Sequence, residues 1–202
     1  FDFLAESGVR QVRDWGGGGN HMLNWRRIEP AEGAYDWTIA DRYLDEATKR
    51  GMKVVPCLGD WWCIQKPLDS WGQEYFPEWA KSRMIFSAGT YAPEAARGVL
   101  MCSTPPEELI DWQRFVKACV SRYKGRITHW EILNEPNVSI TPEYYAAYLK
   151  MMNRIIKEAD PNARVVGFCA TGDLGGNMLK FLDVCFKLGT LDHCDAVSFH
   201  PY

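Results

Sequence analysis

The segment Ile127–Asn137 (ITHWEILNEPN) decides the fold, because its character changes abruptly at one point. Its first seven residues read as a short, largely apolar strand, and the four that follow are polar or proline. Segments with helical periodicity lie on both sides, over 106–124 and 142–159, and Thr141-Pro142 supplies an N-cap and a first-turn proline for the second. A strand between two helices that ends in polar residues indicates a βαβ unit with its chemistry at the carboxyl end of the strand.

The same alternation extends outward in both directions. A helix is expected to end near Ser7 with Gly8 after it. Strands are expected at 9–13, 53–58, 127–133, 164–168 and 196–199, and further helices at 36–50 and 177–188. Two α/β architectures fit this order, a doubly wound open sheet and a TIM (β/α)8 barrel.

Loop lengths separate the two architectures. The connections that follow strands are long and aromatic, above all 59–104, whereas those that follow helices are short. In a barrel, the loops after the strands build the active face, so the long loops favour a barrel. The glycines at 16–19 lack the G-x-G-x-x-G spacing of a nucleotide-binding turn, and we interpret them as a flexible loop.

Composition excludes several function classes. The chain has 202 residues, a net charge of -3, 47% hydrophobic residues and 24% charged residues, which is ordinary globular composition. No apolar run approaches the roughly 20 residues of a membrane helix, and the weak acidity offers no footprint for nucleic acid. The seven Cys are odd in number and irregularly spaced, so they predict no disulfide framework. No metal-ligand spacing supports a zinc site, and we expect neither a metal nor another cofactor.

Polar and aromatic side chains gather at the expected strand ends. In chain order these are Arg13, Asp14, Trp15, Asp60, Trp61, Trp62, Asn134, Glu135, Thr171, Asp173, His200 and Tyr202. The set has no Ser or Cys nucleophile with a base and no metal triad, whereas carboxylates, amides and exposed indoles are the side chains that recognise sugars. A structural interpretation stands beside this one: a single Trp is more often core, and Arg13 can pair with Glu131, whose strand parity points it into the barrel.

Three motifs, in order, resemble a known group of enzymes. Asn134-Glu135-Pro136 resembles the end of the fourth strand in clan A glycoside hydrolases, which are (β/α)8 barrels. The pattern W-x-x-I-E-P-x-x-G-x-Y-D-W over 25–37, with Val12-Arg13 before it, resembles their second strand and its loop, and His200-Pro201-Tyr202 resembles the tip of their sixth strand. The spelling is most similar to family 39, the β-xylosidase/iduronidase type, and next to family 5. Gly59-Asp60 stands where many family 5 members carry a histidine.

The resemblance implies that residues 1–202 are a single incomplete catalytic domain, a partial barrel from about helix one to strand six. Strand one and strands seven and eight are expected to lie outside the chain. Glu135 would be the general acid/base of a retaining enzyme, and Asn134 would bind the sugar 2-OH. The nucleophilic Glu would lie on strand seven, positioned by Arg13 and Tyr202.

The remaining sites follow from the same resemblance. His200 would line the sugar subsite, and Asp60, Trp61 and Trp62 would complete the substrate site. We therefore expect a retaining glycosidase that cleaves O-glycosidic bonds in a plant or microbial oligo- or polysaccharide by double displacement. The 202 residues alone would be inactive, because they would lack the nucleophile.

Two other functions stay open at this point. One is a non-catalytic carbohydrate-binding protein on a degenerate barrel, and the weaker is a metal-dependent barrel hydrolase that uses Asp60, Asp173 and His200. The sugar, the linkage and the oligomeric state are not indicated by the sequence. Secretion or another extracytoplasmic location suits the full-length form of a polysaccharide-degrading enzyme, whereas seven unpatterned Cys argue against an oxidising compartment.

Overall fold

The computed structural model describes residues 1–15, 21–59, 76–88, 100–138, 140–172 and 177–201. Several sequence predictions fall outside these described residues: the glycine loop at 16–19 and the site candidates Asp60, Trp61, Trp62, Asp173 and Tyr202. Among the described helices, none combines the length and the hydropathy needed to cross a membrane.

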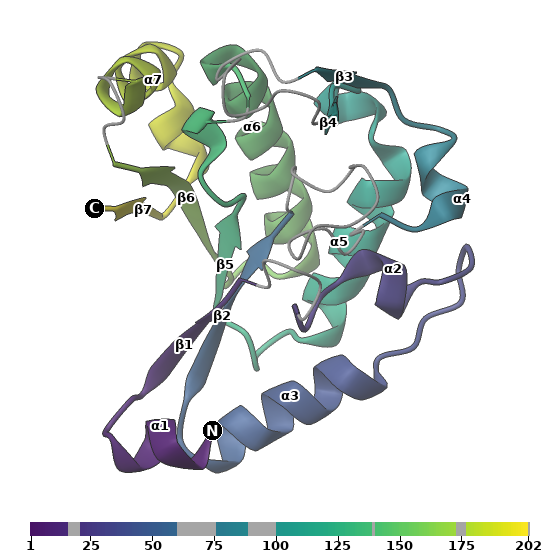
Figure 1. Ribbon diagram of the computed structural model, residues 1–202, viewed down its shortest axis with the longest axis vertical. Coiled ribbons are helices and arrows are strands. Elements are labelled where there is room, and N and C mark those ends of the chain that lie inside the picture. The colour runs from purple at the N-terminus through teal and green to yellow at the C-terminus, as the bar shows by residue number, and fades with distance from the viewer. Residues whose placement is uncertain (16–20, 60–75, 89–99, 139, 173–176, 202) are drawn as a thin grey trace.

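The main sheet has five strands, and every neighbouring pair in it is parallel. The strands are β1 (Gln11–Asp14), β2 (Lys53–Leu58), β5 (His129–Ile132), β6 (Arg164–Thr171) and β7 (Ala196–His200), and their order in the sheet follows their order in the chain. A doubly wound sheet would reverse direction at a switch point. The unbroken order, visible in Figure 1, therefore confirms the interpretation as part of a (β/α)8 barrel.

The helices follow the predicted segments closely. They are α1 (Asp2–Glu6), α2 (Trp25–Ile28), α3 (Thr38–Lys49), α4 (Glu78–Lys81), α5 (Ile110–Arg122), α6 (Pro142–Ala159) and α7 (Asn177–Lys187), with 3-10 turns at Pro106–Glu108, Pro136–Val138 and Thr190–His193. The cap of α6 is the predicted one, because the side chain of Thr141 accepts a hydrogen bond from the Tyr144 N–H at 3.2 Å.

Three short elements were not predicted. They are α2, α4 and the antiparallel hairpin of β3 (Phe86–Ala88) and β4 (Leu100–Cys102). Each helix or strand among them spans four residues or fewer, which is too short for hydrophobic periodicity to reveal it.

The core lies between the strands and the helices on one side of the sheet, where α5 and α6 run side by side (Figure 1). Trp25 packs there against Trp112 and Phe115, with ring centroids 5.4 Å apart in both pairs. Trp25, Trp112 and Trp130 are all fully buried. These three indoles supply core volume, in line with the structural interpretation of a single Trp.

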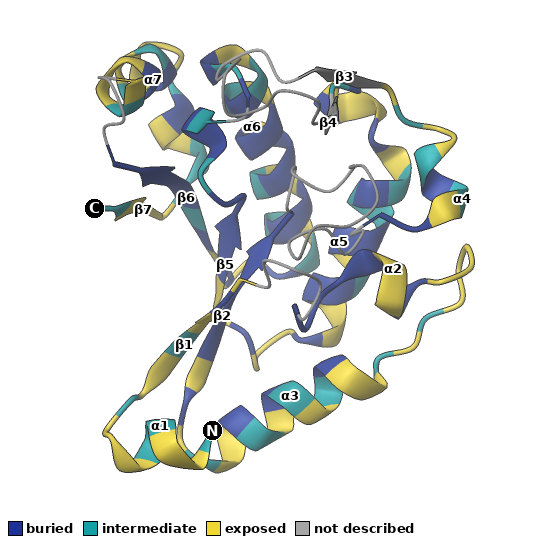
Figure 2. Cartoon of the chain, in the orientation of Figure 1, coloured by how far each residue is buried: buried dark blue, intermediate teal, exposed yellow. Residues whose placement is uncertain are grey.

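Burial differs between the middle of the sheet and its two edges. Figure 2 shows β2, β5 and β6 mostly dark blue, whereas β1 and β7 are largely exposed or half-buried. On β7, Val197 is 46% and Phe199 is 61% exposed. The edge strand β7 thus leaves apolar side chains open to solvent, whereas Val12 of the other edge strand, β1, is half-buried against the core.

Candidate functional site

The side chain of Arg13, on β1, is the centre of a polar cluster on the concave side of the strands. Its Nε donates to the Glu131 carboxylate, and its Nη2 donates to Asn134 Oδ1 at 2.9 Å and to Cys169 Sγ at 3.0 Å. The predicted pairing of Arg13 with Glu131 is therefore present. One guanidinium ties together β1, β5 and β6, which are distant in the sequence.

Glu131 is a buried carboxylate whose charge is fully compensated. Its side chain is 4% exposed, Arg13 donates to Oε2, and the Ser198 hydroxyl donates to Oε1 at 2.8 Å. Burial opposes the charge of Arg13, but its acidic neighbours Cys57, Cys169 and Glu131 raise its pKa overall, so it remains a cation. A carboxylate bonded at both oxygens holds strands together and is poorly placed to react.

Glu135 is the accessible carboxylate of this region. It follows β5, and its Oε1 lies 2.7 Å from Nδ1 of His200 at the end of β7. The two side chains are 21% and 20% exposed, respectively, so the pair is open to solvent on one side. Asn134, directly before Glu135, is only 7% exposed and has its carbonyl end held by Arg13.

The backbone at this point is strained. Leu133 has φ 62° and Glu135 has φ 49°, a left-handed conformation that costs non-glycine residues roughly 1–3 kcal/mol each. Two hydrogen bonds hold it: Leu133 N–H donates to Leu58 O, and Glu135 N–H donates to Cys169 O, each at 3.1 Å. The buried Leu133 side chain anchors the turn in the core, and the turn directs Glu135 toward His200.

A β-bulge brings Cys169 into the cluster. The register between β6 and β7 shifts between Phe168 and Ala170, and both Phe168 and Cys169 have positive φ, at 76° and 41°. Phe168 packs toward the helices, where its N–H bonds to the Tyr145 hydroxyl, so the next residue faces the opposite side. Burial and the nearby charge of Glu131 raise the pKa of the Cys169 thiol to about 11.

The buried side chain of His21 links the loop after β1 to β2. His21 Nε2 lies 2.6 Å from Cys57 O, and the Leu23 N–H donates to His21 Nδ1 at 2.8 Å. A ring that donates at one nitrogen and accepts at the other is neutral, and burial lowers the pKa of His21 accordingly. Asp14, at the end of β1, accepts from the Met22 N–H at 2.9 Å, so this loop is tied to the strand.

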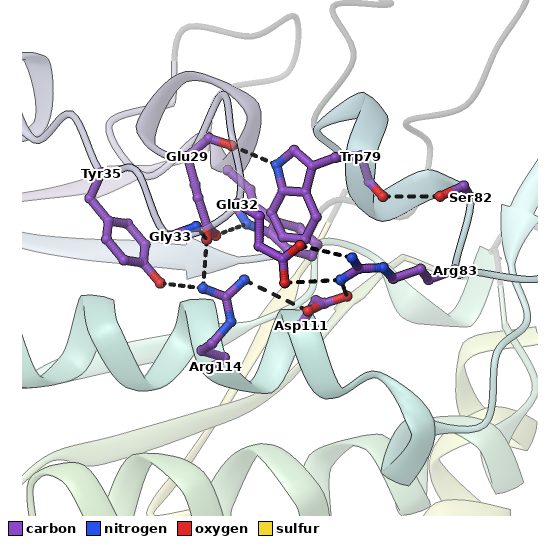
Figure 3. A network of polar contacts seen from close by, with 10 residues as sticks. Glu29, Glu32, Gly33, Tyr35, Trp79, Ser82, Arg83, Asp111 and Arg114 are labelled. Atoms are coloured by element: carbon purple, nitrogen blue, oxygen red, sulfur yellow. Dashed lines mark hydrogen bonds and ion pairs between the residues drawn. The ribbon is translucent and has the colours of Figure 1, made fainter.

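The Glu29 carboxylate of the I-E-P motif is an anchor and not a reacting group. It is fully buried and accepts hydrogen bonds from Trp25 Nε1, the Gly33 N–H and Arg114 Nη1, all at 2.7 Å. Figure 3 shows how Arg114, on α5, meets Glu29 and Tyr35, while Trp79 Nε1 donates to Glu29 O at 3.1 Å. The residues of this motif therefore fasten the loop after β1 to α5.

Asn137-Val138-Ser139 matches the N-glycosylation sequon N-x-S/T. Its first residue, Asn137, has a structural role. It is 2% exposed, and its amide donates to Thr171 O at 3.2 Å and accepts from the Thr171 N–H at 3.0 Å. These bonds join the turn after β5 to the end of β6. Ser139 lies outside the described residues.

The structure brings together four of the predicted site residues: Arg13, Asn134, Glu135 and His200. Asp60, Trp61, Trp62 and Tyr202 lie outside the described residues. Cys169 and Ser198 were missed. Ser198 lies two residues before His200 on β7, so strand alternation places both side chains on the same face and could have predicted it. The bulge between Phe168 and Ala170 breaks the alternation on β6, so the same reasoning could not have predicted Cys169. Within the described part of the chain, no group of three or more His, Cys, Asp or Glu residues is arranged to hold a metal ion.

Comparison with known proteins gives matches of three kinds. A family model described as beta-galactosidase (Glyco_hydro_42) matches residues 21–161. Endo-1,4-beta-xylanase 1 of Gibberella zeae is 24% identical over 153 residues, which cover 72% of this chain and 35% of that protein. Xylanase 10B from Thermotoga petrophila RKU-1 has a TM-score of 0.60 at 19% identity, covering 98% of this chain and 54% of that one.

A family 39 glycoside hydrolase from Bacteroides cellulosilyticus WH2 also has a TM-score of 0.60, at 20% identity, covering 100% of this chain and 34% of that one. The chain spans about a third of the length of the curated relatives it matches, between 26% and 35%. These structural likenesses establish the fold.

The parallel strand order and the structural likenesses together define a partial (β/α)8 barrel, with a carboxylate and a histidine at the carboxyl end of its strands. The family model covers more than half of the chain, and the chain therefore belongs to the family that it describes, Glyco_hydro_42, within glycoside hydrolase clan A. The matches do not single out family 39, which the motif spelling favours.

Proposed function

We propose that this chain is part of a retaining glycoside hydrolase in which Glu135 is the general acid/base. The observation that carries the proposal is the half-open Glu135–His200 pair at the carboxyl end of the sheet, on a strained turn that the core enforces. Residues with such strained backbone conformations cluster at functional sites. The second carboxylate of the cluster, Glu131, is bonded at both oxygens, which leaves Glu135 as the candidate among the described residues.

The chemistry needs a proton donor that later becomes a base. In the first step Glu135 protonates the glycosidic oxygen as the nucleophile attacks the anomeric carbon, and in the second it takes a proton from the incoming water. Arg13 donates to the carbonyl oxygen of Asn134, so the amide NH2 is the group of this side chain that would donate to the sugar 2-OH. His200 and the residues Asp60, Trp61, Trp62 and Tyr202 would complete the subsite.

We also propose that further strands cover the two edges of the sheet in the full-length protein. The exposed apolar side chains of β7 and the open edge of β1 support this, as does the greater length of the relatives. The nucleophilic carboxylate would then lie on a strand next to β7, about 5 Å from Glu135, as a retaining mechanism requires. Arg13 and Tyr202 would help to position it.

The substrate class follows from the relatives and the motifs together. The curated relatives are named endo-1,4-beta-xylanases, and the family model is described as beta-galactosidase. With the family 39 spelling of the motifs, these names support a β-linked glycoside, and we propose a β-xyloside of plant or microbial origin as the first substrate to test.

The test is Glu135→Gln in the full-length protein, with Glu108→Gln, an exposed glutamate before α5, as the matched control. Glu135→Gln is expected to lower kcat/KM on unactivated xylosides by about 10²- to 10⁴-fold, the usual contribution of acid/base catalysis. Aryl glycosides with good leaving groups should lose less in the first step, and added azide should restore turnover. Near-normal hydrolysis by Glu135→Gln would refute the assignment, and binding without turnover by the unmodified protein would favour the carbohydrate-binding alternative.

A further inference from the structure

We propose that Trp15, which directly follows β1, is a stacking platform for a sugar ring of the substrate, on the glycone side of the bond that Glu135 protonates. The inference rests on the proposed function of Glu135 and names a further side chain that binds the substrate of the same site. Two observations carry it: the exposure of the indole, and its place one layer of side chains beyond Arg13.

Trp15 differs in burial from the other tryptophans that the structure describes. Three of those lie in the core, and Trp37 and Trp79 are half-buried beneath arginine side chains. Trp15 is 36% exposed, and no ring stack, side-chain hydrogen bond or cation–π contact joins its indole to another described residue. Single exposed apolar side chains are common on proteins, so the position of this one decides what it can do.

Alternation along β1 directs Trp15 to the concave side of the sheet. Val12 packs against the core, and Asp14 accepts hydrogen bonds from the Met22 N–H and the Tyr43 hydroxyl, so both residues face the helices. Arg13, between them, faces the concave side. Successive side chains of a strand point to opposite faces, and Trp15 therefore follows Arg13 onto the concave side.

The layers of side chains inside the barrel fix the height of the indole. Arg13 and Ser198 both donate to the Glu131 carboxylate, so these three residues form one layer across the sheet. They come from β1, β5 and β7, which are alternate strands in the sheet order (Figure 1). Alternate strands are the ones that share a layer in a (β/α)8 barrel.

The next layer on this face lies two residues further along each strand, about 7 Å nearer the carboxyl end. β7 contributes His200 to it, and His200 Nδ1 lies 2.7 Å from Glu135 Oε1. β1 contributes Trp15. The indole therefore shares its layer with the candidate acid/base, and β5 with its turn lies between Trp15 and His200.

The side of the scissile bond follows from Asn134. Its amide would bind the 2-OH of the glycone, and its carbonyl oxygen accepts from Arg13, the residue of β1 that precedes Trp15 by two positions. Trp15 thus lies on the Asn134 side of Glu135, and His200 lies on the other. A contact between Trp15 and the substrate belongs to the glycone side.

The chemistry of a β-xylopyranose suits an indole. Its hydroxyls are equatorial, so both ring faces present axial C–H groups. The negative face of an aromatic ring attracts such C–H groups, and covering the indole removes apolar surface from water. Covering roughly 60 Å² of apolar surface corresponds to about a tenfold gain in affinity.

The direct test is ¹⁹F NMR of the full-length protein labelled with 5-fluorotryptophan. The Trp15 resonance is assigned by its loss in Trp15→Tyr, and the ligand is thio-linked xylotriose, which glycosidases do not hydrolyse. The Trp15 resonance should shift to saturation, whereas those of the core residues Trp112 and Trp130 should stay in place. A Trp15 resonance that does not move, whether or not xylotriose binds, would overturn the proposal.

Kinetics supply the second readout. Trp15→Ala should raise KM for xylotriose about tenfold with kcat within about twofold, and Trp15→Tyr, which keeps a ring, should raise it less than about threefold. The control is Phe3→Ala, which removes a 77% exposed ring from α1, before the amino end of β1, and should leave KM unchanged. Equal KM values for Trp15→Ala and Phe3→Ala would contradict the stacking contact.

An aryl β-xylobioside separates the two sides of the bond, because both of its sugars lie on the glycone side. Trp15→Ala should raise KM for it as much as for xylotriose, and a loss confined to xylotriose would overturn the assignment to the glycone side. If Glu135→Gln retains normal activity, the proposed function of Glu135 fails. The NMR titration still decides whether Trp15 contacts the sugar, because it requires no turnover.

Discussion

A side chain at Gly59, directly after β2, should destabilise the protein for two reasons, the backbone conformation and the packing around it. Gly59 has a φ of +91°, in the region that favours glycine, and it is buried. A Cβ at this position would lie 2.8 Å from Leu133 Cδ2 and 3.2 Å from the Tyr148 hydroxyl. Leu133 is itself on the strained turn before Glu135, so the contact reaches the candidate active site.

The cost of Gly59→Ala has two parts. The left-handed backbone costs alanine about 1–2 kcal/mol. Overpacking adds about 1–3 kcal/mol, because Leu133 is only 1% exposed and the Tyr148 hydroxyl is held by Trp112 Nε1 at 2.7 Å, so neither neighbour can withdraw easily. Together the free energy of unfolding should fall by about 2–5 kcal/mol.

Gly51→Ala is the matched control, since Gly51 has φ +71° but no atom lies within 4 Å of the place its added Cβ would take. It should cost only the backbone part, about 1–2 kcal/mol. Guanidinium unfolding of the full-length protein measures both losses, and comparison of the slopes shows whether the unfolded states match. Equal losses for the two variants would refute the packing argument, and no loss at Gly59 would refute both parts.

Three further outcomes are expected. Glu29→Gln should reduce the free energy of unfolding by about 2–4 kcal/mol in denaturant titrations, because it removes a buried charge paired with Arg114, whereas Glu32→Gln on the surface should cost much less. His21 is held neutral with a lowered pKa, so unfolding takes up a proton once the pH is below the pKa of about 6.5 in the unfolded chain. The free energy of unfolding should therefore keep its full value from this group above that pH and decrease below it. His21→Gln should flatten this part of the stability–pH curve. Asn137 should carry no glycan in a glycosylating host, because its amide is buried and bonded to the Thr171 backbone, and an occupied site in peptide mass spectrometry would contradict the structure.

Much of the fold was predictable from local patterns. β2 and α6 have the predicted bounds, because an apolar run and a capped, periodic helix are properties of neighbouring residues. The convergence of Arg13, Asn134, Glu135 and His200 was also predictable, since parallel strands bring their carboxyl ends to one edge. The short elements α2, α4 and β3–β4 were not, because three or four residues hold too little periodicity.

The sequence by itself determined the order of strands and helices, the partial barrel and the position of Glu135 at a strand end, because periodicity, caps and motif spacing are all written along the chain. Only the tertiary structure decided what those side chains contact. The bulge at Phe168 turned Cys169 into the polar cluster, and the packing of α5 made Glu29 an anchor. These outcomes depend on contacts between residues far apart in sequence, where one register shift reverses which face a side chain occupies.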